Sequence, residues 1–122
     1  MSVDRQAEGM GMRDQQAVRA LADRVRRLLA DDTVADKRMF GGVTFLVNGN
    51  MLCCVFDNGL MIRVGREAEA AALAKPFVRP PSQTRKMPGF VFVENPGLEV
   101  DAALAAWLAQ GRANVDPMQA KK

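Results

Sequence analysis

Two turns with the chemistry of tight β-hairpins, Asn48-Gly49-Asn50 and Asp57-Asn58-Gly59, constrain this chain more than any other feature of its sequence. Asn, Asp and Gly accept the positive φ values that such turns require, so each turn predicts a pair of antiparallel strands. Apolar runs lie before, between and after the two turns. We therefore expect residues 37–64 to form an antiparallel meander, which begins with Lys37-Arg38-Met39-Phe40 and passes through Gly41-Gly42.

Helices are expected on both sides of this meander. Residues 14–30 place apolar side chains at spacings of three and four, which makes one apolar stripe along a first helix. Asp14 supplies a carboxylate near the start of this helix, and Asp31-Asp32-Thr33 ends the pattern. An Ala-rich segment at 66–75 predicts a short second helix, which stops before Pro76.

The last third of the chain predicts strands followed by a third helix. Residues 77–79 are expected to form a brief edge strand, and residues 80–86 form a loop by composition. The run at 90–93 is a compact strand because it joins aromatic and β-branched residues. Residues 100–110 predict the closing helix, and Gly111 is expected to stop it.

The order of these elements is α-β-β-β-α-β-β-α. Strands grouped in hairpins form an antiparallel sheet, and three helices need an apolar face to cover. The sequence therefore predicts an α+β fold, a two-layer sandwich in which helices lie on an antiparallel sheet of about five strands. At 122 residues we expect one domain over 14–113, between a flexible segment at 1–13 and a flexible tail at 114–122.

The composition excludes several classes of function. The chain has no histidine, which excludes Ser-His and Cys-His nucleophilic pairs and histidine-bearing zinc sites. It has no run of about 18 apolar residues, so no transmembrane helix is expected, and residues 1–13 lack the apolar centre of a secretory signal. Lys and Arg number 17 against 14 Asp and Glu, and a net charge of +3 does not by itself indicate a nucleic-acid binder.

The two cysteines, Cys53 and Cys54, are adjacent, and without a third cysteine no disulfide framework can form. A reducing compartment fits this usage, so we expect a cytoplasmic protein. Alternation along a strand sends one thiol to each face of the sheet. One is then a small core residue, and the other is exposed or lies under a helix. A redox role is less favoured, because Leu52 and Val55 offer no group that stabilises a thiolate.

No motif predicts a catalytic, cofactor or metal site. Gly41-Gly42 is followed by a strand instead of a helix, so it indicates a bulge, a bend or a close backbone approach and not a phosphate cradle. Asp31, Asp32 and Asp36 cluster at a helix end, where Asp commonly makes local turn hydrogen bonds. Basic residues in or next to the predicted sheet form the candidate interaction surface. They are Lys37, Arg38, Arg63, Arg79, Arg85 and Lys86.

The run from Lys37 to Gly42, Lys-Arg-Met-Phe-Gly-Gly, resembles the Arg-Met-Phe-Gly-Gly signature of the TfoX/Sxy N-terminal domain family. A turn with a Met-led strand, an apolar strand carrying a basic residue and a Pro-Phe step follow in the family's order. The chain departs from the family at Phe90 and Phe92, where Tyr is usual. The motif residues to which we assign a structural role are Arg38, Met39, Phe40, Gly41, Gly42, Gly49, Pro76 and Phe77.

This resemblance implies an α+β domain like those of the secretion-chaperone-like fold, in agreement with the order of elements. It also implies a bacterial regulatory context, since full-length TfoX/Sxy proteins help to switch on competence genes alongside a cyclic-AMP-responsive activator. Those proteins carry a second, C-terminal domain, and we expect this chain to be a stand-alone copy without it. Whether a separate chain supplies that domain is left open, and the family carries over no catalytic residue.

Three functions remain open. The leading hypothesis is a non-enzymatic regulatory module that binds a protein partner through the sheet edge or an uncovered sheet face near Arg38, Arg63 and Arg79. The first alternative is a regulator that contacts DNA directly, which requires the basic side chains to converge on one face. The second is a small-molecule-binding domain, which requires a deep pocket with convergent polar groups. No cofactor and no membrane partner are expected, and the chain is either a monomer or a homodimer.

Overall fold

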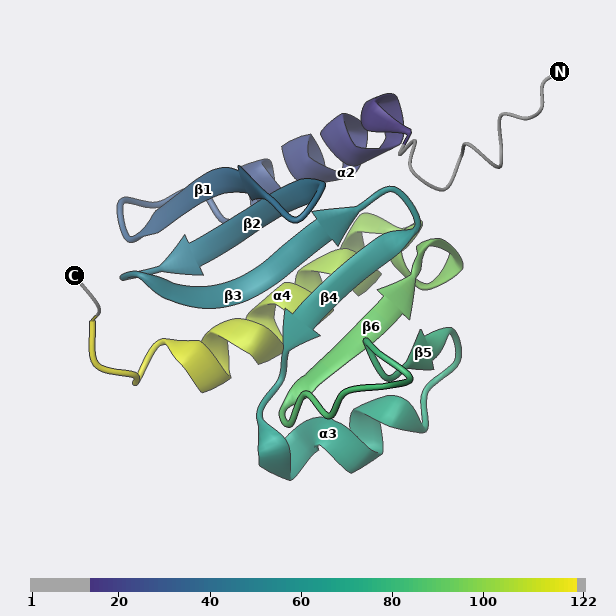
Figure 1. The fold of residues 1–122 in the computed structure, drawn as a ribbon. Coiled ribbons are helices and arrows are strands. Elements are labelled where there is room, and N and C mark those ends of the chain that lie inside the picture. Colours follow the sequence, from purple (N-terminus) through teal and green to yellow (C-terminus); the bar gives the residue numbers. More distant parts are fainter. Residues whose placement is uncertain (1–13, 121–122) are drawn as a thin grey trace, which may run out of the picture.

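The computed structural model describes residues 14–120, which form three α-helices, a short 3₁₀ helix and one antiparallel sheet of six strands (Figure 1). The strands follow the spatial order β1-β2-β3-β4-β6-β5, and every neighbouring pair is antiparallel. The helices are α2 (Gln15–Leu28), α3 (Arg66–Leu73), the 3₁₀ helix η1 (Asn95–Leu98) and α4 (Asp101–Val115). The strands are β1 (Val34–Met39), β2 (Gly42–Val47), β3 (Asn50–Phe56), β4 (Gly59–Arg63), β5 (Val78–Arg79) and β6 (Phe90–Glu94).

The predicted α+β class and antiparallel sheet are confirmed, with one strand more than expected. The meander has four full strands, because β1 begins at Val34 and pairs along its whole length with β2. Its centre, Asp36-Lys37-Arg38, is exposed. An edge strand of this kind lacks the apolar alternation that marks a half-buried strand, so its full extent is not visible in the sequence pattern.

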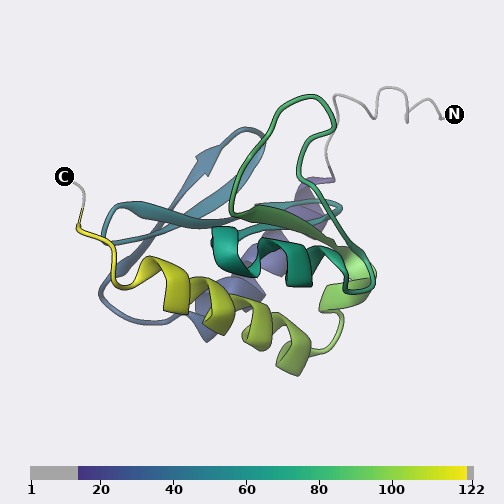
Figure 2. The same cartoon turned by 90° about the horizontal axis from the view of Figure 1, so that it is seen from below.

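The three helices all lie on the same side of the sheet (Figure 2). Helix α2 packs on β2 and β3, α4 on β3 and β4, and α3 on β5 and β6. The Asp14 carboxylate caps α2 by accepting hydrogen bonds from the N–H groups of Gln16 and Ala17, each at 3.1 Å. No helix among residues 14–120 has the length and apolar character needed to cross a bilayer.

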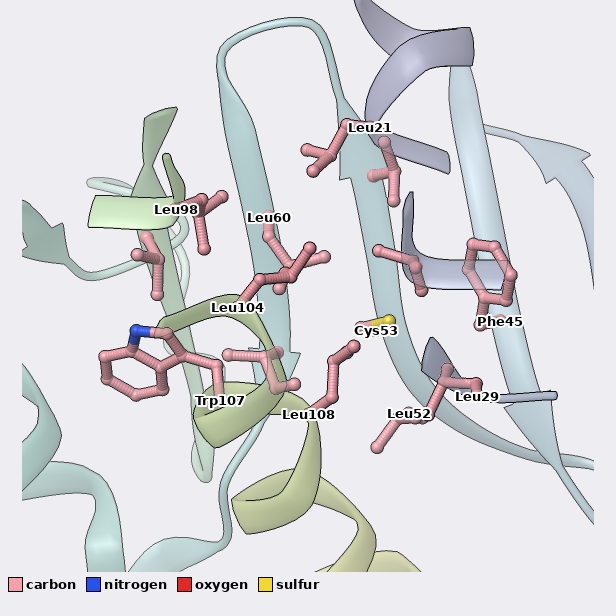
Figure 3. Close-up of a cluster of buried hydrophobic side chains, with 14 of the residues drawn as sticks. Leu21, Leu29, Phe45, Leu52, Cys53, Leu60, Leu98, Leu104, Trp107 and Leu108 are labelled. Carbon is pink, nitrogen blue, oxygen red and sulfur yellow. The ribbon is translucent and has the colours of Figure 1, made fainter. Parts of the chain in front are cut away.

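The main core lies between the helices and the sheet (Figure 3). Leu52 and Leu60 point from the sheet towards Leu104 and Leu108 of α4, and all four are almost fully buried. Trp107 also belongs to this core, and Lys75 Nζ lies 5.0 Å from the centroid of its ring. The stripe predicted for the first helix is the buried face of α2, except for Leu28, which the prediction included and which is 42% exposed.

The expectation that Gly111 stops the last helix is wrong, since α4 continues to Val115, which is buried. A Cβ at position 111 would lie 2.8 Å from Leu52 Cδ1 and 2.9 Å from Ile62 Cδ1. Gly111 therefore allows α4 to approach the sheet closely. In the sequence this glycine resembles one that ends a helix, although tertiary packing is what requires it. The boundary expected at residue 113 falls inside α4, and the segments 1–13 and 121–122 lie outside the described residues.

Candidate functional site

The face of the sheet turned away from the three helices, here called the outer face, carries one continuous row of side chains across all six strands. Residues directly opposite each other in antiparallel strands project to the same face, so the register defines this row. A cation stands at each end, Lys37 on β1 and Arg79 on β5. The full row is Lys37, Thr44, Cys54, Met61, Phe92 and Arg79.

The centre of this row is buried. Thr44 and Cys54 have no exposed surface, Phe92 is 5% exposed and Met61 is 9% exposed. The Thr44 hydroxyl donates a hydrogen bond to Cys54 Sγ at 3.3 Å, which satisfies a polar group that burial would otherwise penalise. Four partly buried residues pack around this second cluster. They are Met51, Phe56, Met87 and Phe90.

The adjacent cysteines divide between the two faces as expected from strand alternation, and both are buried. Cys53 belongs to the core under the helices, where burial and the neighbouring Cys54 raise the pKa of its thiol. The expected exposure of one thiol, or its position under a helix, does not hold for Cys54. Cys54 lies on the outer face, where its neighbours cover it.

Two arginines lie over aromatic rings of the outer face. The Arg79 guanidinium is 4.4 Å from the ring centroid of Phe92, and its Nε donates to Glu94 Oε2 at 3.0 Å. The Arg63 guanidinium is 5.5 Å from the ring centroid of Phe90, and its Nη1 donates to the Met51 carbonyl at 3.3 Å. These contacts hold both cations against an apolar surface.

Arg38 is separate from this group, because it points to the helix side of β1. Its Nη2 donates to Gln15 Oε1 on α2 at 2.7 Å. Lys37, one residue earlier, is exposed and belongs to the outer face. The structure thus places Lys37, Arg63 and Arg79 on one face and Arg38 on the other.

Arg85 and Lys86 belong to the loop 80–88, which rises on the outer side of the sheet (Figure 2). Together with Glu69 this loop lines a hollow of about 570 Å³. The Ser82 hydroxyl accepts hydrogen bonds from the N–H groups of Thr84 and Arg85, both at 3.2 Å, and so shapes the loop. Because most of the lining residues are exposed, the hollow is unlike the deep pocket that a small-molecule site requires.

Two arginines on the helix side, Arg24 and Arg112, are held in ion pairs. Arg24 lies 2.9 Å from Asp101, and Arg112 contacts Asp31 at 2.9 Å and Asp116 at 2.7 Å. On the outer face, the ion pair found among residues 14–120 is Arg79 with Glu94. The outer face and its loop therefore carry an excess of positive charge. Within the same described residues, no three Cys, Asp or Glu side chains are grouped as metal ligands.

The two glycines of the signature run, Gly41 and Gly42, allow a tight hairpin turn and close packing between neighbouring strands. Gly41 has a φ of 79° in the turn between β1 and β2. A Cβ at Gly42 would clash with the Val55 carbonyl oxygen of β3 and would lie 3.1 Å from Phe56 Cδ1, so glycine allows the backbone of β3 to come close. The Phe56 and Phe92 ring centroids are 6.4 Å apart. Of the bulge, bend or close backbone approach expected at Gly41-Gly42, the close approach is confirmed at Gly42, and Gly41 lies in a two-residue hairpin turn.

From the sequence we assigned structural roles to Phe40 and Phe77, and we did not predict that both side chains are exposed. Phe40 is 65% exposed with a φ of 57°, and Phe77 is 50% exposed with a φ of 65°. A bulky residue rarely adopts a positive φ. A signal was present at Phe40, since Phe-Gly joins two β runs just as Asn48-Gly49 does.

The profile of the TfoX N-terminal domain matches residues 26–114, from the second half of α2 almost to the end of α4. This match covers more than half of the chain, and the chain belongs to the TfoX N-terminal domain family. A search of the curated proteins finds no match, and a search of the solved structures finds none.

Proposed function

We propose that this protein is a non-enzymatic regulatory module that binds a protein partner through its outer face. The observation that carries the proposal is the row from Lys37 to Arg79, which has a cation at each end and a buried apolar centre. The regulatory role in bacterial competence that the family resemblance implies is part of this proposal. A cytoplasmic location is also part of this proposal, and its support is that Cys53 and Cys54 are buried and form no disulfide.

The composition of the outer face favours a protein over other partners. Aromatic residues, Met and Arg are enriched at the centres of protein interfaces, and the partly exposed residues of the outer face are of these types. They are Met51, Phe56, Met87 and Phe90, beside Arg63 and Arg79. The positive charge around them favours a partner that carries carboxylates. The Phe90 and Phe92 rings are covered by guanidinium groups, so they do not offer the bare faces on which nucleic-acid bases stack.

Charge reversal on the outer face tests this proposal. The double variant Lys37→Glu/Arg63→Glu is compared with wild type and with Arg19→Glu, which reverses an exposed charge on α2. The tagged full-length proteins are used to capture partners from native cells. We expect one discrete protein with wild type and Arg19→Glu, and its loss with the double variant, whose fold is checked by circular dichroism. Equal capture by all three proteins would contradict the proposal.

Direct contact with DNA is the second candidate, and the loop 80–88 favours it. Arg85 and Lys86 are exposed there beside the hydroxyls of Ser82 and Thr84, a combination suited to phosphate oxygens. The test is the fluorescence anisotropy of labelled duplex DNA at roughly 50 and 200 mM salt. Binding that persists at the higher salt and is lost in Arg85→Ala/Lys86→Ala would support contact with DNA. Absence of binding at both salt concentrations would exclude it.

A further inference from the structure

Two consecutive hairpins of this protein have the same turn geometry. β1 is joined to β2, and β2 to β3, by a two-residue loop between paired strands. The φ values are 57° at Phe40 and 79° at Gly41 in the first turn, and 50° at Asn48 and 82° at Gly49 in the second. Two successive positive φ values are the mark of the type I′ turn, in which Asn-Gly is the preferred pair.

The two turns differ at their first residue. Asn tolerates the left-handed conformation because its short polar side chain can hydrogen-bond locally, whereas a bulky side chain is strained there. Phe40 therefore occupies a position whose backbone favours the residue found at the equivalent position 48. The first hairpin is less stable with Phe40 than it would be with Asn.

Packing does not compensate for this strain. Phe40 is 65% exposed, the largest exposed fraction among the exposed large apolar residues of the described chain. Phe77 also has a positive φ, but it is held by its surroundings. Its carbonyl accepts a hydrogen bond from the Glu94 N–H at 2.8 Å, and its Cβ faces Gly97. Strain at an exposed bulky residue points to a role outside the folded chain itself.

The position of the turn indicates where that role lies. The turn between β1 and β2 rises on the same side of the sheet as the loop 80–88, at the margin of the outer face (Figure 2). The exposed Lys37 of the outer face precedes it on β1. A partner that covers the outer face would therefore also reach this turn.

We infer that Phe40 is an anchor that inserts into an apolar pocket of the protein partner, and that a carboxylate at the rim of this pocket faces Lys37. The inference rests on the proposed function. It adds to that function the residue that anchors the partner, Phe40, and the chemistry of the pocket that receives it. A single exposed ring at a tight turn fits a pocket, which is the usual arrangement of an interface hot spot. A membrane surface is less favoured, because Gly41 and Gly42 beside this ring add no apolar side chain to insert.

Substituting Phe40 with Asn, and Asn48 with Phe, tests the backbone strain at Phe40 without requiring a partner. We expect Phe40→Asn to raise the thermal unfolding midpoint by about 2–5 °C and Asn48→Phe to lower it by a similar amount. A lower midpoint in Phe40→Asn would show that Phe40 is needed for folding, and it would overturn the inference whatever the partner does.

A photo-reactive phenylalanine analogue placed at position 40 of the full-length chain tests the contact in native cells. The matched control carries the same analogue at position 48. We expect a covalent adduct with one protein from position 40 only. Added wild-type protein should suppress this adduct. The concentration of Phe40→Asn needed for the same suppression should be at least about tenfold higher, because burial of a Phe ring contributes strongly to affinity.

Two outcomes of this experiment would overturn the inference. If Phe40→Asn suppresses the adduct as well as wild type while Lys37→Glu/Arg63→Glu does not, the anchor is wrong and the proposed function stands. If no protein adduct forms from position 40 and the protein instead binds vesicles of phosphatidylglycerol and phosphatidylethanolamine through Phe40, the partner class is wrong.

Discussion

Gly111 of α4 faces Leu52 of β3 so closely that a Cβ at position 111 would lie 2.8 Å from Leu52 Cδ1. Both residues are buried at the contact between the last helix and the centre of the sheet. The approach of α4 to the sheet thus depends on the absence of a side chain at this position.

Gly111→Val should lower the free energy of unfolding by about 1–3 kcal/mol, because the added atoms overpack a dense core. The control is Ala109→Val, which introduces the same side chain at an exposed position of α4 and should change stability by about 0.5 kcal/mol or less. Urea denaturation measures both variants. Equal effects would show that the contact between α4 and β3 adapts without strain.

Arg24 connects α2 to the segment before α4. Its Nη2 donates to the Leu98 carbonyl at 2.7 Å and to Asp101 Oδ1 at 2.9 Å. We expect Arg24→Ala to lower the free energy of unfolding by about 1–2 kcal/mol, because it removes a donor from a part-buried carbonyl. Asp101→Asn should cost less, since its carboxylate is 71% exposed. If Asp101→Asn costs more than Arg24→Ala, the Leu98 hydrogen bond is not the main contribution.

The carboxyl group of Asp31 makes the stability of the fold depend on pH in the acid range. Its hydrogen bonds from Thr33, followed by that from Arg112, lower the pKa of its carboxyl from 3.8 to about 2. A pKa that is lower in the folded state stabilises the fold above pH 3.8, and this contribution disappears as the pH falls towards 2. The unfolding midpoint of wild type should therefore exceed that of Asp31→Asn near neutral pH, and the difference should narrow below pH 4. A difference that stays constant down to about pH 2 would contradict this assignment.

Asp32→Asn is the matched control for this pH series. Asp32 is the exposed neighbour of Asp31, so its substitution removes one carboxylate from the same loop. This variant keeps the hydrogen bonds that Asp31 accepts from Thr33 and Arg112, so its unfolding midpoint near neutral pH should stay closer to that of wild type than the midpoint of Asp31→Asn does.

Cys53 should be inert towards thiol reagents in the folded protein. It is fully buried, and burial together with Cys54 raises the pKa of its thiol, so little of the nucleophilic thiolate forms. In a Cys54→Ala variant, a chromogenic disulfide reagent at pH 8 should label Cys53 only after denaturant is added. Labelling of the native variant at the rate of an exposed thiol would show that the core opens readily at β3.

The parts of the fold that sequence reasoning predicted well depend on local chemistry. Asn48-Gly49 forms its turn because both residues accept positive φ, and α2 follows the spacing of its own apolar residues. The outer face was predicted only in part. Arg63 and Arg79 meet there as neighbours of aromatic rings, but Arg38 turns to the helix side and pairs with Gln15.

The sequence by itself determined the α+β class, the hairpin turns at Asn48-Gly49-Asn50 and Asp57-Asn58-Gly59, and the family, because turn residues, apolar periodicity and the signature run are contained in short segments. Tertiary structure decided the row from Lys37 to Arg79, the role of Gly111 and the exposure of Phe40. The physical reason is that strand register, helix-to-sheet distance and solvent exposure arise from the packing of residues far apart in the chain. No local pattern at Lys37 specifies that Arg79, five strands away in the sheet, completes its row.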